Sequence, residues 1–238
     1  MFTKLIDKIE RIRYPGDPRL SEDMHAYLVH SYPNNHNYLI SDGQLKPLKK
    51  LSHRYRALKA CYPETVTSFL DLSMSKGYFV FDAAAQSSCE LALGIDVFKE
   101  DVARCRTIQQ SMGWDKPCFE QIQLGELADR IDEFGGPYQT AVMINMYQYL
   151  FFGSNRHLGS YLNHSKIFEK LRQVCDGRLI FNNRVNIQHC QNKAQIKMAG
   201  EKAGEYTLST LLKSAAQYFD IDDRGLYGRY PLVIFHAK

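Results

Sequence analysis

Two short stretches of this chain constrain its fold more than any others. Residues 68–79, with the sequence SFLDLSMSKGYF, predict a buried strand, a tight turn of small residues and the start of a helix. Residues 91–97, LALGIDV, predict a second strand followed by an acid, Asp96. Strand, helix and strand make a βαβ unit, whose first turn lets backbone N–H groups approach a ligand. We therefore expect a parallel sheet with a ligand site at the ends of its strands.

The spacing of the small residues in the first turn distinguishes between ligands. A dinucleotide loop has the spacing G-x-G-x-x-G. Here Ser73, Ser75 and Gly77 follow Asp71 at every second position. This order resembles the acid-x-G-x-G-x-G loop of class I S-adenosylmethionine (SAM) methyltransferases, and the resemblance covers about residues 64–238. It implies SAM as the cofactor and methyl transfer as the reaction.

The loop departs from the family pattern at two positions. Ser73 and Ser75 stand where the family has its first two glycines. Serine leaves room for a ligand, but it has a steric cost at positive φ that glycine lacks. Either both residues have negative φ, or the loop is displaced and cofactor binding is weakened. A serine hydroxyl that binds the methionine carboxylate would offset part of that loss.

Alternating strands and helices after this loop predict an α/β fold with a doubly wound sheet. We expect a mostly parallel seven-stranded sheet with an antiparallel C-terminal strand, formed by residues 230–236 after a turn at Asp222–Gly225. The antiparallel strand is a feature that the resemblance implies. We expect two parts, a mainly helical N-terminal extension or lid over residues 1–63 and a SAM-binding domain over residues 64–238. The expected core strands span residues 66–72, 90–95, 118–124, 138–145 and 178–182, and the expected helices span residues 76–86, 99–112, 126–133, 164–175 and 206–216.

Residues at the strand ends are the candidates for cofactor binding. Asp96 lies nineteen positions after Gly77, close to the spacing of about twenty for a ribose-binding acid. Three acids at strand ends have an interpretation other than cofactor binding. Asp71 is alternatively a turn cap, Asp96 an exposed acid at a strand end, and Glu126 a charge favoured by the helix dipole. The resemblance implies the following cofactor-binding set: Asp71, Ser73, Ser75, Gly77, Tyr78, Asp96, Val97, Glu126, Leu127, Asn145 and Met146.

Methyl transfer from a sulfonium is an in-line displacement, which alignment and desolvation accelerate. A general base is needed only when the nucleophile carries a proton near the reaction. Tyr147, Tyr149 and His157 follow the fourth predicted strand and are the candidates for such a base. The alternative for His157 is an ordinary loop histidine.

Composition excludes several classes of protein. The chain has 238 residues, 45% of them hydrophobic, with no run long enough for a membrane span and an N-terminus too charged for a secretory signal. Its six cysteines form no C-x-x-C pair and its histidines have no zinc spacing, so we expect reduced thiols and no metal. The expected location is the cytoplasm, without a membrane partner.

Residues 46–59 contain a cluster of basic side chains with apolar residues at helical spacing. A solvated helix face is one interpretation, and a footprint for phosphate is the other. The leading hypothesis is a SAM-dependent methyltransferase for a small or conjugated metabolite, with Tyr27, Tyr32 and Tyr38 lining a lid. The alternatives are an RNA (tRNA) methyl- or SAM-derivative transferase, and a catalytically inactive, methyltransferase-like binding or scaffold protein. Residues 186–205 are either a surface helix or a mobile flap.

Overall fold

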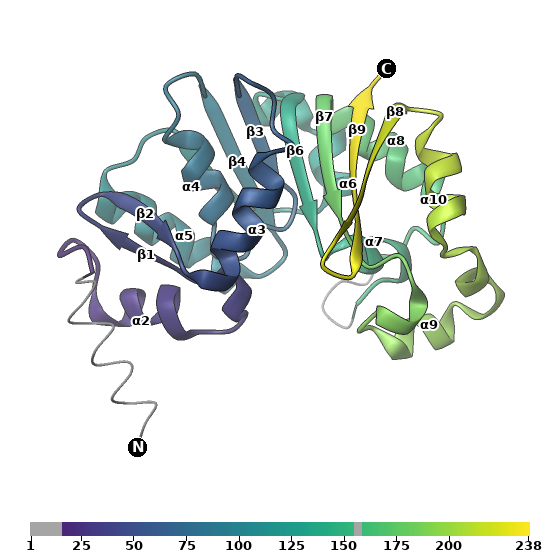
Figure 1. Cartoon of the computed structure of the whole chain (residues 1–238), viewed down its shortest axis with the longest axis horizontal. Coiled ribbons are helices and arrows are strands. Elements are labelled where there is room, and N and C mark those ends of the chain that lie inside the picture. Colours follow the sequence, from purple (N-terminus) through teal and green to yellow (C-terminus); the bar gives the residue numbers. More distant parts are fainter. Residues whose placement is uncertain (1–15, 155–158) are drawn as a thin grey trace.

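The computed structural model describes residues 16–154 and 159–238, and a seven-stranded sheet lies at its centre (Figure 1). The order along the sheet is β5-β4-β3-β6-β7-β9-β8. β9 runs antiparallel to both of its neighbours, β7 and β8, and the other strands are parallel. This confirms the expected doubly wound sheet with an antiparallel C-terminal strand. The strands are β3 (Ser68–Asp71), β4 (Leu91–Asp96), β5 (Pro117–Gln121), β6 (Tyr138–Ile144), β7 (Cys175–Asn182), β8 (Phe219–Tyr227) and β9 (Tyr230–Ala237).

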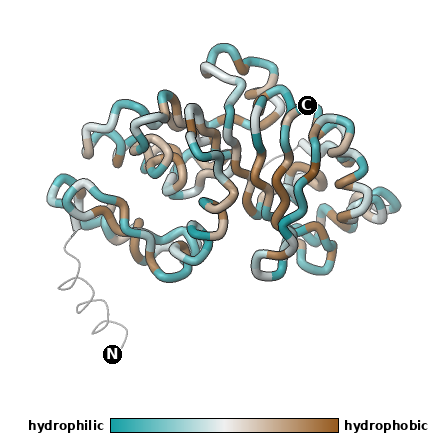
Figure 2. The backbone as a smooth tube through the Cα atoms, turned by 45° about the horizontal axis from the view of Figure 1, so that its top comes forward, coloured by the Kyte–Doolittle hydropathy of each residue, from teal (hydrophilic) through white to brown (hydrophobic). Residues whose placement is uncertain are grey.

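Helices cover both faces of the sheet, and its inner strands β3, β4, β6 and β7 are mostly buried, whereas the edge strand β8 is mostly exposed (Figures 1 and 2). On β3, Phe69 packs with α4 and α5, and Leu70 packs on the opposite face with α6 and α8. This alternation follows from the two-residue period of a strand. One face carries α3 (Lys49–Lys59), α4 (Tyr78–Ala84) and α5 (Lys99–Met112), and the other carries α6 (Leu124–Asp129), α7 (Tyr147–Phe152), α8 (His164–Val174) and α10 (Leu208–Ala215).

The strand order reverses between β4 and β6, which lie on opposite sides of β3. The chain leaves β3 to form β4 on one side and later returns to form β6 on the other. At such a switch point the connections diverge, and a crevice opens outside the carboxyl ends of the strands. The loops after β3, β4 and β6 therefore lie at this crevice.

The predicted turn at Asp222–Gly225 is wrong. β8 continues to Tyr227, and Gly225, with φ +78°, lies in a bulge where the register against β9 shifts. The hairpin turns instead at Gly228, with φ +64°. Glycine permits positive φ in a bulge as well as in a turn, so the residue type alone does not separate the two.

The extension before the sheet contains a hairpin in addition to its helices. α2 (Glu22–His30) and η1 (Asn34–His36) precede β1 (Tyr38–Ser41) and β2 (Gln44–Pro47). Asp42 and Gly43 connect the two strands with φ values of +52° and +73°. A two-residue Asp-Gly loop is typical of a type I′ hairpin, which explains strands where we expected mainly helix.

The extension shares the core of the α4 and α5 face. Leu28, Tyr38, Leu51 and Leu58 are wholly buried there. The apolar stripe of the basic segment therefore packs on the sheet domain, and Lys49, Lys50, His53 and Arg56 stand on the outer face of α3.

Residues 186–205 fold into short helices after β7. They form η3 (Ile187–His189), α9 (Lys193–Met198) and η4 (Gly200–Glu205). All six cysteines are free thiols. Within residues 16–154 and 159–238, no helix is long and apolar enough to cross a membrane. The same residues contain no group of three or more His, Cys, Asp or Glu side chains placed to hold a metal ion.

Candidate functional site

A cavity of about 890 Å³ lies at the carboxyl ends of the parallel strands. Its floor comes from the loops after β3, β4, β5 and β6, and its remaining walls come from residues 32–36, Arg184 and residues 191–195. Small-molecule sites span about 300–1,000 Å³, so this cavity is near the upper end of that range. Seven of the predicted site residues line it: Ser73, Ser75, Asp96, Val97, Asn145, Met146 and Tyr149.

The loop after β3 has the tight form that its small residues favour. Ser75 has φ +50° and Gly77 has φ +74°, whereas Ser73 is not among the residues with positive φ. The Ser73 hydroxyl donates to the carbonyl of Ile144 at 3.1 Å, which ties the loop to the end of β6. Serine at positive φ costs roughly 1–2 kcal/mol, so Ser75 is strained and Ser73 is not. The two serine positions therefore differ in their conformational cost.

Asp96 orders this loop from the end of β4. Its Oδ2 accepts from the backbone N–H of Ser75 at 3.0 Å, and its Oδ1 accepts from that of Phe98 at 3.1 Å. Burial raises the pKa of the carboxyl, and these hydrogen bonds oppose that rise. Each carboxylate oxygen has a second acceptor site, and Asp96 lines the cavity. The carboxylate is therefore positioned to accept two hydroxyl groups of a ligand.

Asp71 lies beneath the loop and not on the cavity wall. It is buried, and its Oδ1 accepts from the backbone N–H of Ser73 at 3.0 Å. Burial raises its pKa to about 7, helped by the nearby Asp96 and opposed by Ser73 and Arg54. This is the turn-cap interaction that we considered for Asp71.

The raised pKa of Asp71 predicts a pH-dependent stability. An acid with a higher pKa in the folded than in the unfolded chain binds more protons when folded, so stability falls as pH rises through that window. Relative to Asp71→Asn, whose amide oxygen still accepts from Ser73, wild type should lose about 2–4 kcal/mol between pH 4 and pH 8. Urea unfolding of both proteins at the two pH values measures this, and equal pH dependence would contradict it.

Asn145, at the end of β6, has an unusual backbone and an unpaired side-chain oxygen. Its φ is +58°, and among the described residues its buried Oδ1 has no hydrogen-bond partner. Next to it, the backbone N–H groups of Met146 and Tyr147 donate to Oδ1 of Asn183 at 2.7 and 2.9 Å. An unpaired buried acceptor is costly, and other atoms of the same residue line the cavity.

The three candidate bases have different environments. The wholly buried Tyr147 bonds through its hydroxyl to Nδ1 of His164 at 2.6 Å and is absent from the cavity lining. Tyr149 lines the cavity and donates to Oε1 of Gln191 at 3.0 Å, and burial raises its pKa, so it is protonated at neutral pH. His157 lies outside the described residues.

The four other predicted residues do not line the cavity. Gly77 is the last residue of the loop, where an added Cβ would meet Sγ of Cys105 at 3.0 Å. Tyr78 is buried against Tyr38 and Tyr55. Glu126 is exposed and paired with Arg130 at 2.9 Å, and Leu127 is in the core.

The wall opposite Asp96 contains residues that our sequence-based set omitted. Tyr32, which we proposed for a lid, lines the cavity and is 83% exposed, whereas Tyr27 and Tyr38 are buried packing residues. His36, Arg184 and residues 191–195 complete this wall. Residues 32–37, YPNNHN, are typical of a loop, and apart from Tyr32 nothing in them indicated a place at the site.

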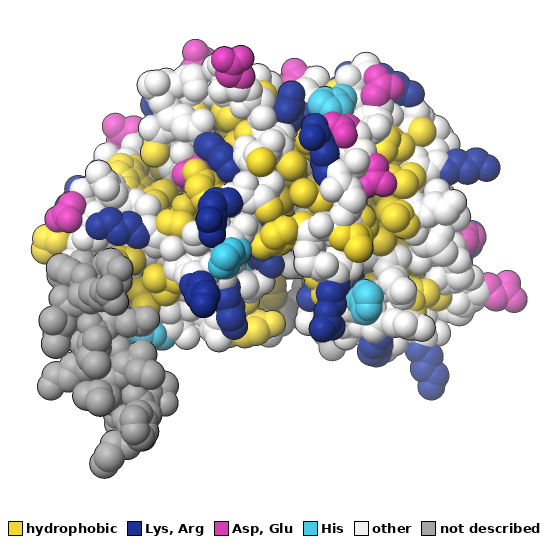
Figure 3. All heavy atoms as spheres, viewed as in Figure 1, with side chains coloured by type: hydrophobic (Ala, Val, Ile, Leu, Met, Phe, Trp, Pro, Cys, Tyr) yellow, Lys and Arg dark blue, Asp and Glu magenta, His cyan; other side chains and the backbone are white. Residues whose placement is uncertain are grey.

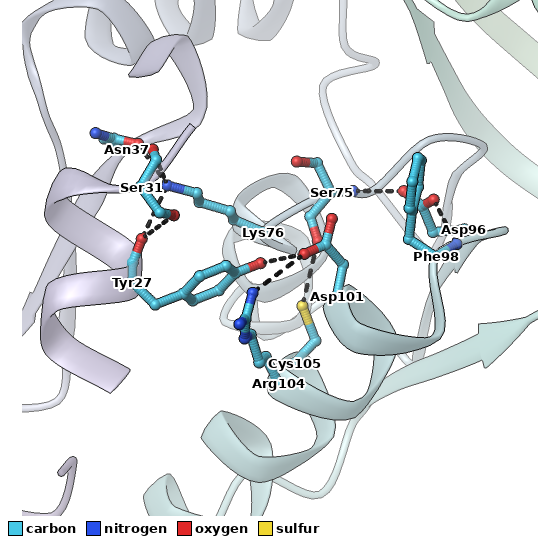
Figure 4. Close-up of polar contacts among 10 residues, drawn as sticks. All are labelled: Tyr27, Ser31, Asn37, Ser75, Lys76, Asp96, Phe98, Asp101, Arg104 and Cys105. Atoms are coloured by element: carbon cyan, nitrogen blue, oxygen red, sulfur yellow. Dashed lines mark hydrogen bonds and ion pairs between the residues drawn. The ribbon is translucent and has the colours of Figure 1, made fainter. Parts of the chain in front are cut away.

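Lys76 connects the loop to the extension (Figure 4). Its side chain is 1% exposed, and its Nζ donates to the carbonyls of Tyr27 and Ser31 at 2.9 and 2.8 Å and to Oδ1 of Asn37 at 2.5 Å. The Tyr38 hydroxyl donates to the carbonyl of Lys76 at 2.7 Å. Residues 27–38, which carry one cavity wall, are therefore fixed to the loop that carries the other.

The chain is similar to several solved structures. The PH0226 protein from Pyrococcus horikoshii OT3 has 13% identity over 80% of this chain and 92% of its own, with a TM-score of 0.53. EvdMO1 has 12% identity over 89% of this chain and 46% of its own, also at 0.53. NodS, an N-methyltransferase from Bradyrhizobium japonicum WM9, has 14% identity over 79% of this chain and 95% of its own, at 0.45.

These likenesses show the fold alone, a doubly wound sheet with one antiparallel strand. The chain spans less than half of the EvdMO1 chain and 40% of the WbdD chain, another similar structure. No protein family and no curated protein matches the sequence.

Proposed function

We propose that this protein is a SAM-dependent methyltransferase that acts on a small or conjugated metabolite in the cytoplasm. The observation that carries the proposal is the position of Asp96, whose carboxylate orders the loop after β3 and faces a cavity at the switch point of the sheet. The unpaired cysteine thiols favour a reducing compartment. The class I methyltransferase fold supports the choice of cofactor.

The residues present fit the cofactor. Asp96 would accept hydrogen bonds from the two ribose hydroxyls. Asn145, which lines the cavity at the end of β6, would lie beside the methionine part. Apolar side chains flank the Asp96 end of the cavity and would enclose the adenine: Ile95, Val97, Ile122 and Leu124.

The bound cofactor supplies an electrophilic methyl group, and the protein aligns the acceptor with it. Alignment and exclusion of water account for the acceleration when no proton moves in the rate-limiting step. The residues at the acceptor wall favour this mode, because Tyr149 is protonated at neutral pH and burial lowers the pKa of His36 to about 3, which makes its imidazole a weak base. The acceptor should therefore present a nucleophile that has already lost its proton or that loses it to water.

Calorimetric titration with SAM and with S-adenosylhomocysteine (SAH) tests the proposal. We expect saturable binding of one molecule of each per chain, since the cavity contains one loop of this type. A folded sample that binds neither would refute the methyltransferase and favour the scaffold protein as the alternative.

A further inference from the structure

The charged residues of the cavity lie at opposite ends. The acids on its wall, Asp96 and Asp101, come from β4 and α5, and both interact with neighbouring groups. Among the described lining residues the lysines and arginines are Arg184 and Lys193, and both lie on the opposite wall, after β7. The proposed cofactor end is therefore acidic, and the acceptor end is basic.

Arg184 is held in place with most of its donors unused. Its Nε donates to the Tyr230 hydroxyl at 3.1 Å, and its guanidinium lies over the Tyr230 ring, 5.1 Å from the centroid. Within residues 16–154 and 159–238, its terminal nitrogens have neither a hydrogen-bond acceptor nor a carboxylate partner. A half-buried guanidinium with two free NH₂ groups matches the two oxygens of a carboxylate or phosphate.

Arg54 adds positive charge behind the same wall. It is buried, and it donates to Nε2 of His36 at 2.9 Å. With the Asn35 amide assigned so that its oxygen faces the guanidinium, that oxygen is its other described partner. It lies close enough to Arg184 for mutual repulsion to help lower its pKa, although burial is the main cause. Both of its hydrogen-bond partners are neutral, and the nearby acid that interacts with it is the buried Asp71.

His36 contributes a donor to the same end. The Arg54 guanidinium has no acceptor atom, so Nε2 of His36 must accept, and the ring proton is on Nδ1. Burial and the nearby cations lower the pKa of His36 to about 3. The imidazole therefore stays neutral at pH 7 and offers an N–H group to a ligand.

We infer that the methyl acceptor is a small anion and that Arg184 binds its carboxylate or phosphate group through its free NH₂ groups. This inference rests on the proposed function. The alternative for the basic residues is RNA. Dark-blue and cyan basic side chains do stand over α3 and along the lower edge in Figure 3. They are exposed on the outer face, however, whereas Arg184 is half-buried in a cavity of small-molecule size.

Titration of the SAH-saturated protein with inorganic phosphate and with malonate tests the inference and separates the two anion types. We expect one site for at least one of them, with affinity reduced at least about tenfold in Arg184→Ala. Arg184→Lys keeps the charge but loses the paired donors, so its affinity should be intermediate. Arg229→Ala is the matched control, because it removes the same charge from an exposed turn, and its affinity should equal that of wild type.

Equal anion affinity in Arg184→Ala and Arg229→Ala, or no anion binding at all, would overturn the inference. An oligoribonucleotide that binds with steep salt dependence, and is weakened as much by Lys49→Ala as by Arg184→Ala, would also overturn it in favour of RNA. The SAH titration is read separately in each variant. Loss of SAH binding in wild type would therefore refute the proposed function, whereas intact SAH binding without an anion site would refute this inference alone.

Discussion

Asp96→Ala should reduce the affinity for SAH by at least about 100-fold in calorimetric titration. The carboxylate would make two charge-assisted hydrogen bonds to the ribose, each worth about 1.5–3 kcal/mol. It also holds the backbone N–H groups of Ser75 and Phe98, so its removal would leave the loop after β3 without its anchor. Both effects lower the affinity, and together they exceed the loss from any single contact.

Asp96→Asn tests whether both acceptor oxygens are needed, because it keeps the size of the side chain but replaces one oxygen with an NH₂ group. Both oxygens of Asp96 accept from backbone N–H groups. An asparagine would therefore place its NH₂ group against one of these donors, and the affinity should fall nearly as far as in the alanine variant. Asp115→Ala, at an exposed position, controls for the change in net charge. SAH affinity within about threefold of wild type in Asp96→Ala would contradict the ribose-binding role.

Local patterns were sufficient to predict the parts of the fold that depend on neighbouring residues. α5 covers the predicted residues 99–112, because its apolar residues have a helical period and Gly113 ends it in a left-handed conformation. β4 ends at Asp96, one residue beyond the prediction. Asp96 reaches the cavity because it is the last residue of β4. A predicted strand end was therefore enough to identify it.

The acceptor wall depends on contacts that no local pattern contains. Residues 32–36, Arg184 and residues 191–195 are separated by up to about 160 positions, and they meet because β6 and β7 continue the sheet beyond β3. The sequence placed the strand ends but not the loops that fold over them. Arg184 follows a predicted strand without any motif, so only the free guanidinium in the structure marks it as a ligand group.

The burial of Lys76 could not be predicted from its neighbours in the sequence. Lysine among small polar residues is typical of an exposed loop, and the sequence gives no reason to bury it. Its burial depends on three oxygen acceptors from residues 27–37, which form only when α2 packs against the loop. The side chain is thus explained by tertiary structure, and its removal should reveal how strongly the two parts depend on each other.

Lys76→Met should lower the free energy of unfolding by about 2–4 kcal/mol, measured by urea titration at pH 7. Methionine keeps most of the buried stem but leaves Tyr27, Ser31 and Asn37 without their donor, and each buried oxygen left unpaired costs about 1–3 kcal/mol. The variant no longer has to bury an ammonium, and the desolvation free energy saved offsets part of this cost. The loss of stability is therefore smaller than the sum for three unpaired oxygens. Burial lowers the pKa of Lys76 to about 8, so the ammonium is present at this pH.

The same substitution should weaken SAH binding about tenfold, because Lys76 lies between Ser75 and Gly77 in the loop after β3. It should also increase hydrogen exchange in α2, because the Lys76 ammonium binds the carbonyls of Tyr27 and Ser31. Lys50→Met, at an exposed position on α3, is the matched control and should leave stability and affinity unchanged. Loss of stability without any change in SAH affinity would show that Lys76 only fastens the extension. Loss of both would show that the extension, through this lysine, holds the loop in its binding conformation.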